Sequence, residues 1–97
     1  MATYIVLANF TEQGIRGVKE TPKRAEAFGQ LCEKMGAKLK DAYRTMGHYD
    51  VVLTVDAPDD VTMSAILYSV GSLGNVRTET LRAFTLQETN AALSKMS

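Results

Sequence analysis

The sequence predicts one α+β domain with the element order β-α-β-β-α-β, a four-stranded antiparallel sheet, both main helices on one face, and a short C-terminal helix. Three observations support this. The chain has 97 residues, which suits a single hydrophobic core. Four segments are rich in β-branched and aromatic residues, and the two longest intervals between them carry apolar residues at helical spacing. Together they describe the split βαβ, or ferredoxin-like, arrangement.

The first strand is expected over residues 3–10 (TYIVLANF), which end at a polar break. A short helical turn is expected near residues 12–19. The main helix follows over residues 22–35, because Thr21 with the proline after it suits an N-cap and a first helical position. Gly36 suits the C-terminal end of that helix.

Residues 37–46 alternate loosely, with Leu39 and Tyr43 assigned to one side and basic residues to the other. This pattern predicts an edge strand, since exposed lysines deter pairing with another chain. After a tight break at Gly47-His48, residues 49–56 (YDVVLTVD) resume strand character. The two strands should therefore form an antiparallel hairpin.

The second helix is expected to open at residues 57–60 (APDD), because proline and carboxylates are favoured in a first turn. Gly74 and Asn75 mark its end, and residues 76–85 form the fourth strand. A Thr-x-x-Glu capping box at residues 85–88 then predicts a short last helix that ends near Ser94. The buried stripe of the second helix is predicted to comprise Ile66, Leu67, Val70 and Leu73.

Composition excludes several function classes. The 11 basic and 11 acidic residues cancel, so no overall field attracts nucleic acid or anionic lipid, and neither is expected as a partner. The lone Cys32 is expected to be a buried apolar residue, and no Cys and His spacing suits a metal. No cofactor motif is present. The only N-terminal apolar run is too short to span a membrane, and a cytoplasmic location is expected.

The same element order describes the RNA-recognition motif, in which aromatic side chains of the third strand stack on bases. In this chain His48 and Asp50 fall where those aromatics belong. A carboxylate there repels the phosphate backbone, so RNA binding is rejected.

The first strand is apolar on both faces, although helices can cover only one face of the sheet. Each exposed apolar side chain forfeits roughly 1.5–3 kcal/mol relative to burial. A second copy of the sheet is the simplest cover, which predicts a homodimer or a higher oligomer. We expect the second subunit to face Tyr4, Val6, Val52 and Thr54, with Asp50 at the rim of any cavity.

Two contiguous segments carry a resemblance to a known family: Gly47-His48-Tyr49-Asp50, and residues 73–84 (LGNVRTETLRAF). With Asn9-Phe10-Thr11 and Gly14-Ile15, the chain resembles the GYD domain family of small bacterial and archaeal proteins. The resemblance covers nearly the whole chain. It implies a ferredoxin-like fold of the dimeric α+β barrel kind, in which the sheets of two subunits face each other. It carries over only the motif positions Gly47, Tyr49 and Asp50, and no catalytic residue.

Asp50 is the most informative polar residue, and two interpretations stay open. Its carboxylate either accepts hydrogen bonds from backbone N–H groups, or it faces a ligand or transfers a proton. The turn positions are Gly47, His48, Gly74 and Asn75, and the candidate ligand-binding residues are Tyr49, Asp50, Thr54, Tyr4 and Arg82.

Two functions compete. The first is a homo-oligomeric small-molecule-binding or regulatory module, which needs a shaped cavity between facing sheets and a few hydrogen bonds. The alternative is a small dimeric α+β barrel enzyme of the monooxygenase or isomerase type, using Asp50 and Tyr49. The enzyme hypothesis rests on analogy of fold alone.

Overall fold

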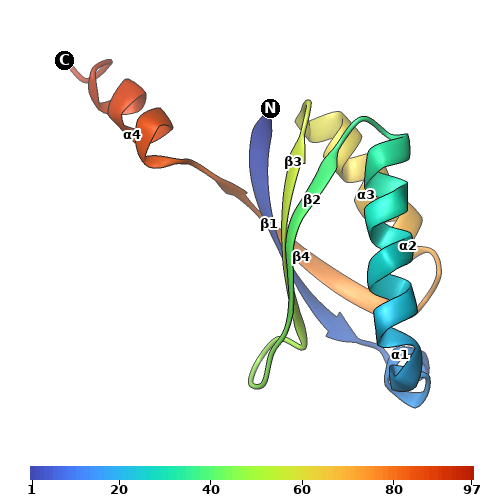
Figure 1. Ribbon diagram of the computed structural model, residues 1–97. Coiled ribbons are helices and arrows are strands. Elements are labelled where there is room, and N and C mark those ends of the chain that lie inside the picture. The colour runs from blue at the N-terminus through green and yellow to red at the C-terminus, as the bar shows by residue number, and fades with distance from the viewer.

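The computed structural model describes all residues from Met1 to Ser97. A four-stranded antiparallel sheet has the order β2-β3-β1-β4, and α2 and α3 lie against the same face of it (Figure 1). The ferredoxin-like prediction is therefore confirmed. The strands are β1 (Ala2–Phe10), β2 (Lys38–Arg44), β3 (Val51–Ala57) and β4 (Val76–Ala83). The helices are α1 (Glu12–Arg16), the 3-10 turn η1 (Val18–Glu20), α2 (Thr21–Lys34), α3 (Asp60–Gly71) and α4 (Leu86–Leu93).

The hydrophobic core lies between the sheet and the two helices that cover it. Burial of Cys32 confirms its assignment as an apolar core residue, and desolvation raises the pKa of its thiol to about 11. The core side chains come from all three layers: Tyr4, Val6, Val55 and Ala57 from the sheet, Phe28 and Cys32 from α2, and Met63 and Ile66 from α3.

The two faces of β1 are the reverse of those predicted. Tyr4 and Val6 are buried beneath the helices, at 4% and 1% exposure, and cannot face a second subunit. The side chains between them, Ile5 and Leu7, are half-buried and point to the other face. Both sets are apolar, so alternation alone could not tell which set the helices cover. The uncovered face, called the open face below, presents Ile5, Leu7, Tyr43, Val52, Thr54 and Leu81.

The prediction that Leu39 and Tyr43 share a side of β2 is wrong. The β2–β3 pairing shifts register between Leu39 and Asp41, which is a β-bulge. Leu39 is opposite Val55 and packs on the core, whereas Tyr43 is opposite Val52 on the open face. An extra residue in a strand reverses every side chain after it, and loose alternation conceals the change.

Smaller differences occur where elements begin and end. Thr21 is the first residue of α2 and not its N-cap, because η1 runs directly into the helix. Leu73 lies beyond α3 and is exposed, since that helix ends at Gly71. Tyr49 and Asp50 belong to the loop before β3. Gly36, Gly47 and Gly74 have positive φ angles, which suits their assignment as breaks.

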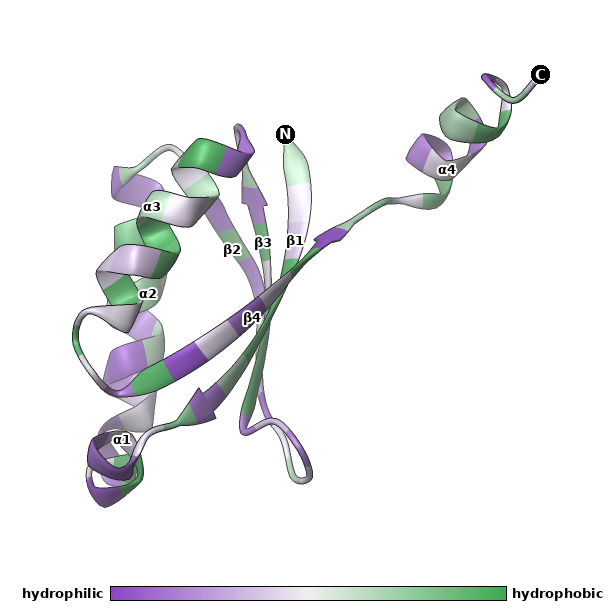
Figure 2. Ribbon diagram, turned by 180° about the vertical axis from the view of Figure 1, so that it is seen from behind, coloured by the Kyte–Doolittle hydropathy of each residue, from purple (hydrophilic) through white to green (hydrophobic).

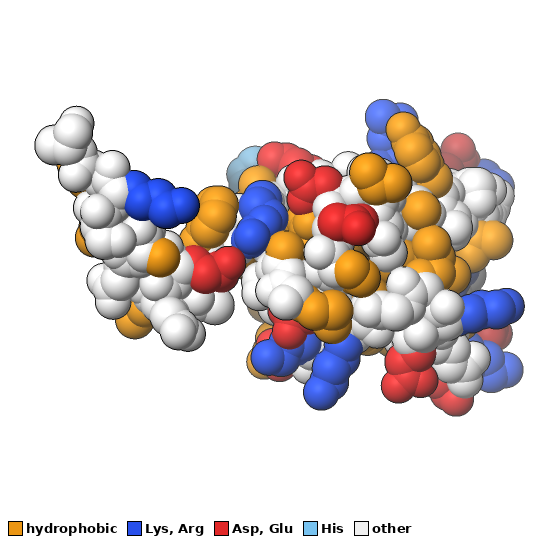
Figure 3. Space-filling view, turned by 90° about the horizontal axis from the view of Figure 1, so that it is seen from above, with side chains coloured by type: hydrophobic (Ala, Val, Ile, Leu, Met, Phe, Trp, Pro, Cys, Tyr) orange, Lys and Arg blue, Asp and Glu red, His pale blue; other side chains and the backbone are white.

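The chain after β4 forms an arm, residues 84–97, that projects from the domain on the side opposite α2 and α3 (Figures 1 and 2). The predicted capping box is present, with Thr85 and Glu88 each accepting a hydrogen bond from the other's backbone N–H. Seen from above, the arm is clear of the rest of the domain (Figure 3). Its apolar side chains are accordingly exposed, among them Phe84, Leu86 and Leu93.

Candidate functional site

The open face is a mostly apolar strip that crosses all four strands. One cross-strand row joins Tyr43, Val52, Leu7 and Glu79, and the next joins Asp41, Thr54, Ile5 and Leu81, so each row ends in one carboxylate. The edge positions are the most exposed, with Tyr43 at 62% and Leu81 at 44%. A polar hydroxyl, that of Thr54, lies within the strip.

Polar pairs border the strip. At one end Asp56 accepts a hydrogen bond from Thr3 at 2.9 Å and pairs with Lys40 at 3.6 Å. Toward the other end, the Tyr49 hydroxyl donates to Glu79 at 2.7 Å. That hydrogen bond and the negative charge of Glu79 raise the pKa of Tyr49. A surface that is apolar in the middle and polar at the edges is typical of one that binds another protein or a small ligand.

Asp50 is bonded to the backbone. Its carboxylate oxygen Oδ2 accepts a hydrogen bond from the Phe10 N–H at 2.9 Å, at the end of β1. Its own N–H donates to the Ala8 carbonyl at 2.9 Å, and its carbonyl accepts from the Thr45 N–H at 2.8 Å. No hydrogen bond joins Asp50 to Tyr49. Of the two interpretations, the backbone-bonded carboxylate is the one the geometry supports.

Tyr4 and Arg82 lie together, but away from the hairpin residues. The buried Tyr4 hydroxyl donates to Asp60. The Arg82 guanidinium lies 5.7 Å from the centre of the Tyr4 ring and 4.5 Å from that of Phe84, and pairs with Glu88 at 3.5 Å. Arg82 thus joins the sheet to the base of the arm. The structure therefore divides the predicted ligand-binding residues between two separate places.

The buried Tyr4 predicts a measurable pH dependence. Burial, followed by the hydrogen bond to Asp60, raises the pKa of Tyr4 from 10.0 to about 12. The folded state therefore holds this proton more tightly, and the resulting stability is complete below pH 10 and lost as pH rises toward 12. The free energy of unfolding, measured by chemical denaturation across this pH window, should fall less steeply with pH for Tyr4→Phe than for the parent protein. Tyr68→Phe, at an exposed position, should keep the parent profile.

The motif residues Gly74 and Asn75 hold α1 against the start of β4. The Asn75 carbonyl accepts from the Thr11 N–H at 3.0 Å, and the Gly74 carbonyl accepts from the Thr11 hydroxyl at 2.5 Å. Gln13 also donates to the Asn75 side chain at 3.0 Å. His48 is exposed in the hairpin loop beside Gly47. These four turn residues therefore shape loops.

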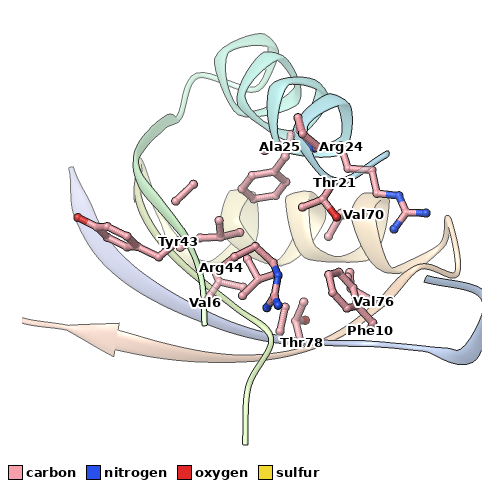
Figure 4. Close-up of a pocket in the computed structure, with 16 residues that line it drawn as sticks. Val6, Phe10, Thr21, Arg24, Ala25, Tyr43, Arg44, Val70, Val76 and Thr78 are labelled. Carbon is pink, nitrogen blue, oxygen red and sulfur yellow. The ribbon is translucent and has the colours of Figure 1, made fainter. Parts of the chain in front are cut away.

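A cavity that the sequence did not reveal lies on the other side of the sheet, beneath the N-terminal half of α2 (Figure 4). Its volume is about 210 Å³ and its walls are mostly apolar. The available sequence signal was a set of small residues at inward positions, namely Ala8, Ala25 and Ala42. Elsewhere, no three His, Cys, Asp or Glu side chains gather as a metal site would require. None of the helices is long and apolar enough to cross a membrane.

Comparison with known proteins places these features in a family context. The family model described as GYD domain matches residues 4–93. A glutamine synthetase and cystathionine beta-lyase binding protein from Thermus thermophilus is 32% identical over 94 residues, which cover 96% of this chain and 99% of that protein.

Solved structures share the fold. TTHA0845 from Thermus thermophilus is 28% identical with a TM-score of 0.57, and the match covers 88% of this chain and 95% of that one. A feast or famine regulatory protein from M. tuberculosis, solved with L-methionine, is 16% identical with a TM-score of 0.65. That match covers 88% of this chain but only 51% of the regulator, so this chain spans about half of the regulator's length.

Proposed function

This chain belongs to the GYD domain family, and we propose that it is a homo-oligomeric binding and regulatory module that assembles through its open face. The observation that carries the proposal is the apolar strip left uncovered by the helices. Burying one such side chain contributes roughly 1.5–3 kcal/mol, against a total domain stability of about 5–15 kcal/mol. A second copy of the same strip covers it by symmetry.

The arm supports assembly independently. It projects on the side of the open face, and Leu86 is 84% exposed. An isolated helix of this length is marginal in water, so α4 is expected to gain stability by packing on a neighbour. In the proposed assembly the apolar residues of the arm contact another copy of the chain.

The facing sheets also enclose polar groups that suit a small ligand. Thr54 contributes a hydroxyl within the strip, and the Tyr49–Glu79 pair borders it. Pockets that bind small molecules combine mostly apolar walls with a few polar groups, as here. The proposed module therefore holds a small molecule between subunits, and its occupancy would alter the assembly.

Leu81→Glu tests the assembly. Placing a carboxylate on the strip beside Ile5 should dissociate the oligomer, because the two-fold related copies would bury like charges. Light scattering after gel filtration at micromolar concentration should give the parent at least twice the chain mass of 10.6 kDa, and the variant a single chain mass. Val61→Glu introduces the same charge at an 80% exposed position of α3 and should leave the mass unchanged. A parent protein of one chain mass would refute the assembly.

A second candidate is an adaptor that binds metabolic enzymes. It is favoured by the Thermus thermophilus relative, which is named for binding glutamine synthetase and cystathionine beta-lyase and matches nearly the whole chain. Surface plasmon resonance with the two purified enzymes distinguishes the candidates. An adaptor should bind one of them in the absence of any small molecule.

The enzyme alternative, a small monooxygenase or isomerase, has less support. It requires Asp50 as a base near Tyr49, but the two side chains have separate partners, Phe10 and Glu79.

A further inference from the structure

The cavity beneath α2 has the properties of a binding site of its own. It lies between the helix and the strands, so it is separate from the open face and from any contact between facing sheets. Phe28 closes it toward the core, where this side chain is 6% exposed. Phe10 and Val76 line the other end (Figure 4). The Tyr43 side chain, although its residue borders the cavity, points away from it (Figure 4).

The size of the cavity suits a ligand with a ring-sized apolar part. The cavity is open to solvent on one side and has a volume of about 210 Å³. A dry apolar cavity of about 150 Å³ accommodates benzene. The space exists because Ala8, Ala25 and Ala42 present single methyl groups where larger side chains would fill it.

Two arginines, Arg24 of α2 and Arg44 of β2, lie at the rim of the cavity. Arg24 donates through Nη1 to the Gly14 carbonyl at 3.0 Å. Arg44 donates to the Thr45 carbonyl at 2.6 Å, and its guanidinium carbon is 5.5 Å from the centre of the Phe10 ring. Figure 4 shows the Arg44 guanidinium beside Phe10 and the Arg24 guanidinium pointing outward, on the other side of Phe10 and Val76. These contacts are to uncharged partners.

Neither arginine is neutralised by the protein. The ion pairs of the structure are Arg16–Glu12, Lys23–Glu20, Lys40–Asp56 and Arg82–Glu88, and none includes Arg24 or Arg44. Each guanidinium carries five N–H donors, of which only the Nη1 donors have protein partners. Positive charge and free donors therefore adjoin an apolar space.

We propose that this cavity binds a small carboxylic acid whose apolar, ring-sized tail lies between α2 and the sheet and whose carboxylate is held at the rim by Arg44, beside Phe10. Guanidinium groups bind carboxylates through paired, charge-assisted hydrogen bonds. The apolar walls exclude water from the tail, which contributes most of the affinity. The site is complete within one chain and does not depend on assembly through the open face.

Phenylacetate and its uncharged analogue phenylacetamide test the proposal by calorimetric titration of the parent protein. Phenylacetate should bind about tenfold more tightly than the amide, a difference of about 1.4 kcal/mol, because its carboxylate accepts charge-assisted hydrogen bonds from the guanidinium group. Arg44→Gln should weaken phenylacetate binding by about tenfold and should leave phenylacetamide binding nearly unchanged. The matched control is Lys23→Gln, an exposed cation adjacent to Arg24, which should bind phenylacetate as the parent does.

Ala25→Phe tests the position of the tail. Filling the cavity should abolish binding of both probes, while circular dichroism verifies that the variant is folded. Equal affinity for the two probes, or no saturation at about 10 mM phenylacetate, would overturn the proposal. So would unchanged binding in a folded Ala25→Phe variant or in the Arg44→Gln variant. Light scattering of the Leu81→Glu variant reports on assembly alone, so the two proposals can fail separately.

Discussion

Gly14→Ala is expected to lower the free energy of unfolding by about 1–3 kcal/mol or more, which is a large fraction of the stability of a domain this small. A Cβ atom at Gly14 would lie 1.9 Å from the carbonyl oxygen of Asn75 and 2.9 Å from its carbonyl carbon. Both are backbone atoms. A side chain could rotate away, but this loop is held by the hydrogen bonds of Thr11, so α1 must move instead.

Urea denaturation of Gly14→Ala, followed by circular dichroism, measures the effect, and Gly71→Ala is the matched control. Gly71 has no heavy atom within 4 Å of its added Cβ and has an ordinary helical φ. Alanine there should leave stability unchanged or raise it slightly, because it restricts the unfolded chain. Equal stability of the two variants would show that the Asn75 backbone moves away from the added Cβ atom at little cost in free energy.

Asp50→Ala is expected to lower the free energy of unfolding by about 1–3 kcal/mol, because the half-buried Phe10 N–H loses its acceptor. Asp50→Asn should lower it much less, since the amide carbonyl oxygen can replace Oδ2 at nearly the same position. This order of stabilities follows from a hydrogen bond to the backbone. If Asp50 were instead a base that transfers a proton, both substitutions would abolish its catalytic activity equally.

Thermal and urea denaturation of the two Asp50 variants and the parent provide the comparison. Thr54→Val serves as a control on the open face, because it replaces a hydroxyl for which the structure shows no hydrogen bond with a methyl group of similar size. An Asp50→Ala variant as stable as the parent would contradict the structural role. Destabilisation of Asp50→Asn equal to that of Asp50→Ala would indicate that the negative charge matters more than the acceptor.

The elements of this fold follow from local chemistry and could be predicted residue by residue. The Thr85–Glu88 capping box begins α4, and Gly36 and Gly74 have the positive φ angles expected of glycines after a helix. The predicted hairpin of β2 and β3 is present, although Tyr49 and Asp50 lie in its loop and not in β3. Each of these features depends on a few neighbouring residues, so it could be predicted from a single sequence.

The candidate sites were predicted less well, because their residues come from distant segments. Tyr4 was assigned to the open face but is in the core, and Arg82 lies beside it, away from Asp50. Asp50 was identified correctly as informative, yet its partner is Phe10, 40 residues earlier in the chain. The cavity beneath α2 was missed because no local pattern marks an empty space.

The sequence by itself determined the order of strands and helices, the fold class and the excess of apolar surface on β1, since these depend on composition and short-range spacing. Only the tertiary structure decided which face of β1 the helices cover, because both faces are apolar and packing against α2 and α3 selects between them. It also decided the bulge between Leu39 and Asp41 and the space left by three alanines. Register and packing depend on contacts between segments far apart in the chain.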